Sequence, residues 1–194
     1  MKQGAAACDL YIGTYTQPIR FGTGEIMQGR GCGIARLRME CTTGAIQDRG
    51  APANVVNPSF LTADKAGRFL YAVNELKEYE GQPGGSASAF AIEKDGLKLL
   101  SAEASVGSDP CFITTSPDWK CAVVSNFMTG SVTVFPIDAE GRLLPHHQFF
   151  QHEGRSVHPV RQQGPHAHSA VFDRAGRYVL VPDLGLDKIM LYRY

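Results

Sequence analysis

Two histidines near the end of the chain have a spacing that suits acid–base chemistry. His166 and His168 are two residues apart in the stretch 163–169, so on a β-strand both imidazoles lie on one face. Imidazole exchanges protons near neutral pH, and Arg161 just upstream is able to grip an anionic group through two hydrogen bonds. The stretch therefore indicates proton transfer on an anionic substrate. The structural alternative is that one histidine caps a turn and the other fills a gap in a sheet.

The composition is that of an ordinary globular protein and excludes several classes of partner. The chain has 194 residues, 43% of them hydrophobic and 20% charged, with a formal net charge of zero. No basic excess favours a nucleic acid, and no apolar run is long enough to cross a membrane. Its five cysteines show no CxxC spacing, so we expect buried free thiols and a cytoplasmic protein. A metal held by His166, His168, Glu75 and Asp183 is an alternative, but one His-x-His with scattered carboxylates is a weak metal signal, so no metal or other cofactor is predicted.

The elements that must position the histidines are short strands that recur with a long period. Runs of Val, Ile, Phe and Tyr alternate with turns rich in Gly, Pro, Asp and Asn, which predicts an all-β fold. Pro58, Pro110 and Pro165 mark equivalent points 52 and 55 residues apart, so we expect the innermost strands of three blades at 58–62, 110–114 and 166–172. A period of about 50 residues with four short strands is typical of a β-propeller blade.

The repeat predicts one partial propeller domain over residues 1–194. Its first strand, 10–16, aligns with 69–75, the second strand of a blade, so the first blade lacks its innermost strand. About three and a half blades are present, fewer than a closed propeller has. We expect either part of a longer protein or copies that self-associate through their open blade edges. The expected blades are about 8–56, 57–107 and 108–160, with an incomplete fourth at about 161–194.

Polar residues recur where the second strand of each blade ends. Asn74 and Glu75 end that strand in the second blade, Asn126 in the third and Asp183 in the fourth. Equivalent strand ends meet at one mouth of a propeller, so we expect Asn74, Asn126 and Asp183 to bind substrate there. The structural alternative is that Asn and Asp stand at these points because they form good turns.

Six short motifs follow one another along the chain. They are YIGTY at 11–15, NPSFL at 57–61, LYAVNE at 70–75, GSV at 130–132, QGPHAHS at 163–169 and DLGLD at 183–187. In this order they resemble the lactonase family of seven-bladed β-propellers, which includes 6-phosphogluconolactonases and carboxy-cis,cis-muconate cyclases. The resemblance covers the whole chain, although the family runs to about twice this length.

The resemblance implies a small-molecule lactone or carboxylate as substrate, and four residues that act on it. One of His166 and His168 is the expected general base or acid, and Arg161 binds the carboxylate or phosphate of the substrate. Glu75 orients or polarises the attacking water. The leading expectation is hydrolysis of a sugar lactone, and the alternatives are muconate cyclisation and a non-catalytic binding module. A serine acyl-enzyme is not expected, because no Gly-x-Ser-x-Gly is present.

Overall fold

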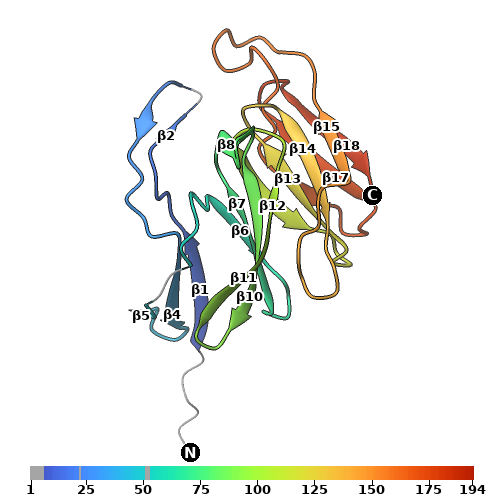
Figure 1. The fold of residues 1–194 in the computed structure, drawn as a ribbon. Helices are drawn as coiled ribbons and strands as arrows, with labels where there is room; N and C mark the ends of the chain where they lie inside the picture. Colours follow the sequence, from blue (N-terminus) through green and yellow to red (C-terminus); the bar gives the residue numbers. More distant parts are fainter. Residues whose placement is uncertain (1–6, 22, 51–52) are drawn as a thin grey trace, which may run out of the picture.

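The computed structural model describes residues 7–21, 23–50 and 53–194, which form four antiparallel sheets side by side (Figure 1). The described residues contain no α-helix, either in the sheets or in the segments that connect them. The first sheet consists of β1 (Ala7–Gly13), β4 (Ile34–Glu40) and β5 (Ile46–Asp48). The second consists of β6 (Phe60–Ala63), β7 (Phe69–Asn74), β10 (Ser86–Glu93) and β11 (Gly96–Ala104).

The remaining two sheets continue the same meander along the chain. The third consists of β12 (Pro110–Thr115), β13 (Cys121–Asn126), β14 (Ser131–Pro136) and β15 (Gln148–Gln151). The fourth consists of β16 (Val171–Phe172), β17 (Tyr178–Asp183) and β18 (Lys188–Arg193). Two small hairpins project from the connections. They are β2 (Ile19–Arg20) with β3 (Ile26–Met27), and β8 (Glu78–Tyr79) with β9 (Gln82–Pro83).

The sheets are joined through strands that are apolar on both faces. On β7, Tyr71 and Val73 pack toward the third sheet, whereas Leu70 and Ala72 pack toward the first. On β13, the run from Cys121 to Val124 alternates in the same way between the second and fourth sheets. Successive side chains of a strand point to opposite faces, so one apolar strand supplies two cores. Because β7 and β13 each pack against a neighbouring sheet on both faces, the four sheets form one continuous stack.

The predicted all-β partial propeller is confirmed, and the second and third sheets begin close to the expected points. The strands expected at 58–62 and 110–114 are β6 and β12. The strand expected at 166–172 is shorter, because ladder pairing is regular only in β16. Upstream of β16 the segment touches β17 through an isolated bridge between Ala167 and Asp183. Pro182 of β17 has no N–H to donate, so a continuous ladder cannot form beside residues 168–170.

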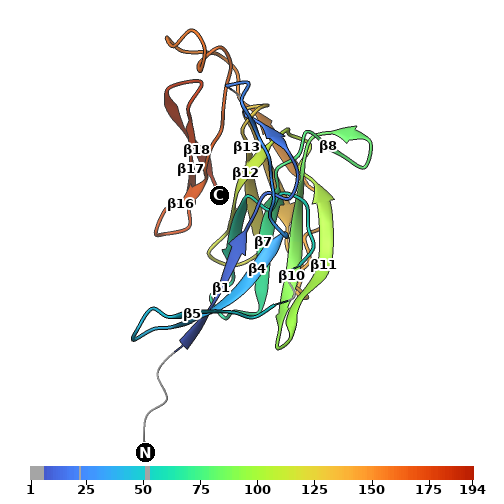
Figure 2. The same cartoon turned by 90° about the vertical axis from the view of Figure 1, so that its left-hand side faces the viewer.

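The first sheet has three strands, as expected from the repeat. β1 pairs with β4 along its whole length, and its other edge carries no strand in the part of the chain that the structure describes. The stretch after β1 contains the hairpin β2–β3 instead of an irregular loop. Figures 1 and 2 show this hairpin at the same end of the molecule as the connection between β15 and β16.

The cysteines differ from expectation in their burial. All five are free, but only Cys121 is buried, whereas Cys32 and Cys41 are exposed because they lie in the turns that flank β4. Among the described residues, no helix is long and apolar enough to cross a membrane.

Candidate active site

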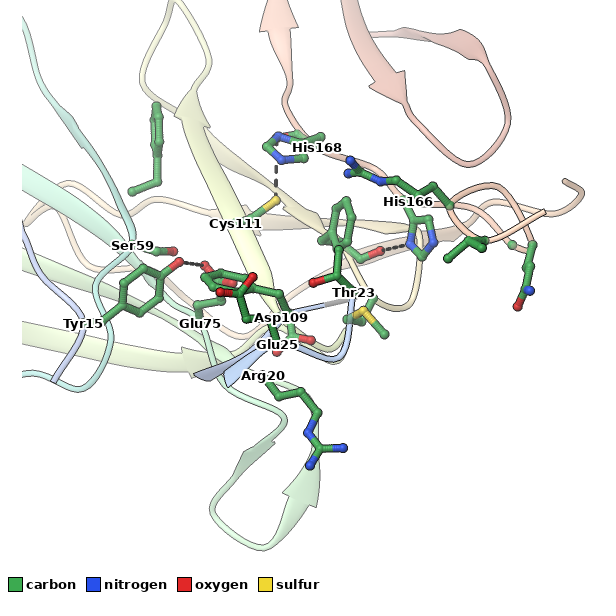
Figure 3. Close-up of a pocket in the computed structure, with 18 residues that line it drawn as sticks. Tyr15, Arg20, Thr23, Glu25, Ser59, Glu75, Asp109, Cys111, His166 and His168 are labelled. Carbon is green, nitrogen blue, oxygen red and sulfur yellow. Dashed lines mark hydrogen bonds between the residues drawn. The ribbon is translucent and has the colours of Figure 1, made fainter. Parts of the chain in front are cut away.

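A cavity of about 860 Å³ opens at the end of the sheets where β1, β7 and β13 stop (Figure 3). Tyr15, Glu75 and Phe127 follow these three strands and line it. The rest of the wall comes from the hairpin β2–β3, from the starts of β6 and β12, and from the connection between β15 and β16. The structure brings all four residues with an expected catalytic role into this cavity. They are His166, His168, Arg161 and Glu75.

The imidazole of His166 is held in one orientation and one tautomer. Its Nδ1 lies 2.9 Å from the carbonyl oxygen of Phe127, and a carbonyl only accepts, so Nδ1 carries the hydrogen. The ring also stacks on the Phe127 ring, with 4.6 Å between the centroids. Nε2 has no hydrogen-bond partner among the described residues. A neutral His166 therefore presents a lone pair that is free to take up a proton.

His168 lies beside it on the same cavity wall. Its ring meets the edge of Phe127 with 5.4 Å between the centroids, so one aromatic ring supports both histidines. Beneath it, Sγ of Cys111 lies 3.6 Å from the carbonyl oxygen of His168 and 3.7 Å from that of Ala167 (Figure 3). Burial raises the pKa of the Cys111 thiol to about 12, so Cys111 is a hydrogen-bond donor to the backbone rather than a nucleophile.

The backbone of the histidine segment is fixed by a buried carboxylate. Asp183 Oδ1 accepts hydrogen bonds from the amides of His166 (2.7 Å) and Leu186 (3.0 Å). Its Oδ2 lies 2.6 Å from Nδ1 of His152, whose Nε2 lies 2.6 Å from the hydroxyl of Tyr192. Burial opposes the ionisation of Asp183, but these hydrogen bonds outweigh it and lower its pKa. Asp183, which was expected to bind substrate, therefore holds the backbone of His166 in place instead.

Two glycines allow the loop before His166 to come close to the neighbouring strands. A Cβ at Gly185 would lie 1.7 Å from the carbonyl oxygen of Gly164. At Gly130, which has a φ of +59°, a Cβ would lie 2.4 Å from the carbonyl carbon of Pro165. A larger residue at Gly185 would push the segment before His166 away from the turn between β17 and β18, and one at Gly130 would push it away from the turn between β13 and β14.

Two arginines contribute positive charge to the cavity. Arg161 lies in the connection between β15 and β16, and Arg20 lies in the hairpin β2–β3. Within the ranges described, neither guanidinium forms an ion pair or a hydrogen bond. Figure 3 shows Arg20 at the edge of the cavity, pointing away from His166. The sequence reading missed Arg20, because nothing in the polar, glycine-rich stretch 17–31 shows which of its side chains reaches the edge of the cavity.

Glu75 lies on the cavity floor next to two further polar groups. Its Oε2 accepts a 2.7 Å hydrogen bond from the hydroxyl of Tyr15. Asp109 lies close by and is only 4% exposed, with a 2.5 Å bond to Nζ of Lys77. Lys77 is thereby neutralised and does not add a free cation to the site. Asp109 also has a left-handed φ of 53°, a conformation that non-glycine residues adopt at few places outside turns and functional sites.

Asn74 and Asn126 do not line the cavity, although they were expected to bind substrate. Asn74 donates to the carbonyl of Val56 and accepts from Ser88, while Asn126 donates to Ser131 and Thr133. Both side chains are buried within their sheets and bonded to neighbours there, although Oδ1 of Asn126 has no partner among the described residues. The sequence contains a sign of this structural role, because a polar residue inside an otherwise apolar strand is buried and needs a hydrogen-bond partner within the protein.

The described residues contain no group of three or more His, Cys, Asp or Glu side chains arranged to hold a metal ion.

Comparison with known proteins gives one consistent result. The family described as "Lactonase, 7-bladed beta-propeller" matches residues 9–194. The chain is 28% identical over 185 residues to a 6-phosphogluconolactonase of Bacillus subtilis, a match that covers 94% of this chain and 48% of that protein.

Solved structures agree with this match. A putative 6-phosphogluconolactonase of Bacteroides fragilis is 33% identical with a TM-score of 0.85, covering 100% of this chain and 49% of that one. A periplasmic gluconolactonase of Pseudomonas aeruginosa is 31% identical with a TM-score of 0.84, covering 97% and 50%. The chain thus spans about half the length of the relatives it matches.

Proposed function

Because the chain belongs to the lactonase family of seven-bladed β-propellers, we propose that the whole protein hydrolyses a sugar lactone of the 6-phosphogluconolactone type. The observation that carries this proposal is the geometry of His166. Its tautomer is fixed through Phe127, its Nε2 is free, and Arg161 lines the same cavity without a partner in the described chain. A base next to an unpaired cation suits the hydrolysis of an anionic ester.

In the proposed reaction His166 acts as the general base. Nε2 takes a proton from a water molecule while the water oxygen attacks the lactone carbonyl carbon. The ring C–O bond then breaks, and the departing alkoxide recovers a proton from the His166 imidazolium, which yields a hydroxy acid. His168 donates to the oxyanion from the same wall, Arg161 binds the phosphate of the substrate, and Glu75 orients the water.

Muconate cyclisation is the second candidate, and the charge of the cavity supports it. With Lys77 paired to Asp109, the cationic side chains left to bind a ligand are Arg20 and Arg161. Two separate guanidinium groups suit two separate carboxylates as well as they suit one phosphate.

A cytoplasmic location is also part of the proposal. It is supported by the exposed free thiols of Cys32 and Cys41, which persist in a reducing compartment.

We expect the whole protein to open 6-phosphogluconolactone faster than the spontaneous reaction. The assay follows acid release in weakly buffered indicator, with gluconolactone and carboxymuconate as parallel substrates and buffer alone as the blank. Turnover of the phosphorylated lactone above that of the other two supports the proposal. Cyclisation of the muconate without lactone opening would favour the second candidate. No turnover of any of the three would favour a binding module.

Self-association of the 194-residue chain through its sheet edges is a further part of the proposal. Ile189 and Leu191 of β18 are 64% and 63% exposed, and the outer edge of β18 pairs with no strand of the described chain. An open edge with apolar side chains is a template for pairing with another copy.

We therefore expect light scattering on the isolated chain to report a mass above the 21.1 kDa of one copy. The mass should rise with concentration. Ile189→Lys together with Leu191→Lys should lower it, because charged side chains on an edge strand oppose pairing. A concentration-independent mass of one copy for the unmodified chain would contradict this expectation.

A further inference from the structure

Tyr15 and Glu75 come from different sheets and meet on the cavity floor. Tyr15 follows β1 of the first sheet and Glu75 follows β7 of the second. The phenol hydroxyl donates to Glu75 Oε2 at 2.7 Å, and both residues line the cavity (Figure 3). A carboxylate that accepts through one oxygen has its second oxygen in a defined direction. The hydrogen bond from Tyr15 thus sets the orientation of Glu75.

Asn57 fixes the two segments that carry this pair. Its Oδ1 accepts from the amides of Thr16 (2.9 Å) and Gln17 (3.0 Å), which hold the chain just after Tyr15. Its Nδ2 and its carbonyl both bond to the backbone of Glu75. Asn57 is buried and has a left-handed φ of 43°, an unusual conformation for a residue that is not glycine. One side chain therefore clamps both ends of the Tyr15–Glu75 contact.

The charges around Glu75 act in both directions. Burial is the largest influence and raises the pKa of Glu75, and the nearby Asp109 carboxylate raises it further. The nearby Ser59 hydroxyl, the hydrogen bond from Tyr15 and the charge of Lys77 lower it. Cys111, which also faces Glu75, remains a neutral thiol and adds no charge. With burial opposing ionisation, the donors to Glu75 decide how much of it carries a charge at a given pH.

We propose that Tyr15 is a positioning residue for the reaction, which holds the Glu75 carboxylate ionised and turned toward the bound water. The inference rests on the proposed function, because it assigns Glu75 to the orientation of that water. The phenol of Tyr15 is itself buried against a carboxylate, which raises its pKa and keeps the donor proton in place. Tyr15 thus acts through Glu75 and takes no proton from the substrate.

Tyr15→Phe tests the proposal by removing only the hydroxyl. Loss of a donor to the ionised form raises the pKa of a carboxylate, so we expect Glu75 to titrate about one pH unit higher in the variant. The readout is the 13C shift of the labelled Glu75 carboxyl in the whole protein, assigned by its disappearance in Glu75→Gln. At pH values below the pKa of Glu75, lactone hydrolysis by Tyr15→Phe should be about tenfold slower than hydrolysis by the wild-type protein. The reason is that the fraction of Glu75 that is ionised is about tenfold smaller in the variant.

Tyr11→Phe is the matched control. Tyr11 lies on β1, just before Tyr15 in the chain, and its buried hydroxyl has no hydrogen-bond partner among the described residues. This variant should leave the titration of Glu75 unchanged. Should Tyr15→Phe not fold, 3-fluorotyrosine at position 15 keeps the shape and is a stronger donor. It is expected to move the titration of Glu75 to lower pH.

The outcomes separate the two proposals. A Glu75 titration that stays in place in Tyr15→Phe, while the wild-type protein hydrolyses lactones, would overturn the role of Tyr15 alone. A lower rate without a shifted titration would do the same, since it marks a structural effect. Absence of lactone hydrolysis in the wild-type protein would overturn the proposed function, and the role of Tyr15 in the reaction with it.

Discussion

Replacing His166 with Ala is expected to lower the rate of lactone hydrolysis by about 10²- to 10⁴-fold, the range observed when a general base is removed. The ring of His166 donates through Nδ1 to the Phe127 carbonyl, so Nε2 is the nitrogen available to the attacking water. Ala leaves the cavity open but supplies no proton acceptor. The loss should appear in kcat, because the base is needed in the transition state rather than for binding.

His168→Ala and His147→Ala are the comparison variants for this experiment, one inside the cavity and one outside it. His168 lines the same cavity but has no ring hydrogen bond in the described structure, so its removal should cost less than that of His166. His147 is exposed and lies outside this cavity, and its removal should leave the rate unchanged. Wild-type rates in both cavity variants, across lactones and muconates, would show that the histidine pair is structural.

Asp183→Ala is expected to lower the free energy of unfolding by about 3–5 kcal/mol, because several buried donors lose their acceptor at once, at about 1–3 kcal/mol each. Asp183 is 2% exposed and His152 is 3% exposed. The change removes the acceptor for the His152 ring and for the amides of His166 and Leu186, and each buried donor then lacks a partner. Urea denaturation of the variant and the parent measures the difference.

The same comparison has a definite pH dependence. The pKa of Asp183 is lowered in the folded protein, so its contribution is present above the ordinary Asp pKa of about 3.9. The contribution is lost as the pH falls through the folded-state value, and the gap between parent and variant should narrow there. Asp95→Ala, at an exposed turn between β10 and β11, should change stability by less than about 0.5 kcal/mol. A loss of similar size in both variants would contradict the role assigned to Asp183.

The parts of the fold set by local chemistry could be read from the sequence. Turns such as 64–68 and 116–120 precede strands that are apolar on both faces, and both β7 and β13 lie where the repeat predicted them. The shortening of the strand at 166–172 could not be read in the same way. It depends on Pro182, a residue that faces the segment only in the folded sheet.

The site was predictable to the extent that equivalent strand ends converge. That rule brought Glu75 and the histidine pair into one cavity. It does not say which of two neighbouring residues turns toward the cavity. Asn74 and Glu75 are adjacent, yet Asn74 is saturated inside its sheet and Glu75 faces the cavity floor. Tyr15 and Arg20 reach the site through the path of a loop, which carries no periodic signal.

The stacking of the sheets has a consequence for the order in which the molecule is made. Each core is formed by two sheets that are neighbours in the sequence, so every sheet can dock as soon as it leaves the ribosome. The cavity forms later, because its wall includes both Tyr15 and His168, which are far apart in the sequence. A nascent chain can therefore pack its first two sheets before the histidine pair exists, and a chain that ends before His166 would contain Tyr15 and Glu75 without the opposite wall of the cavity.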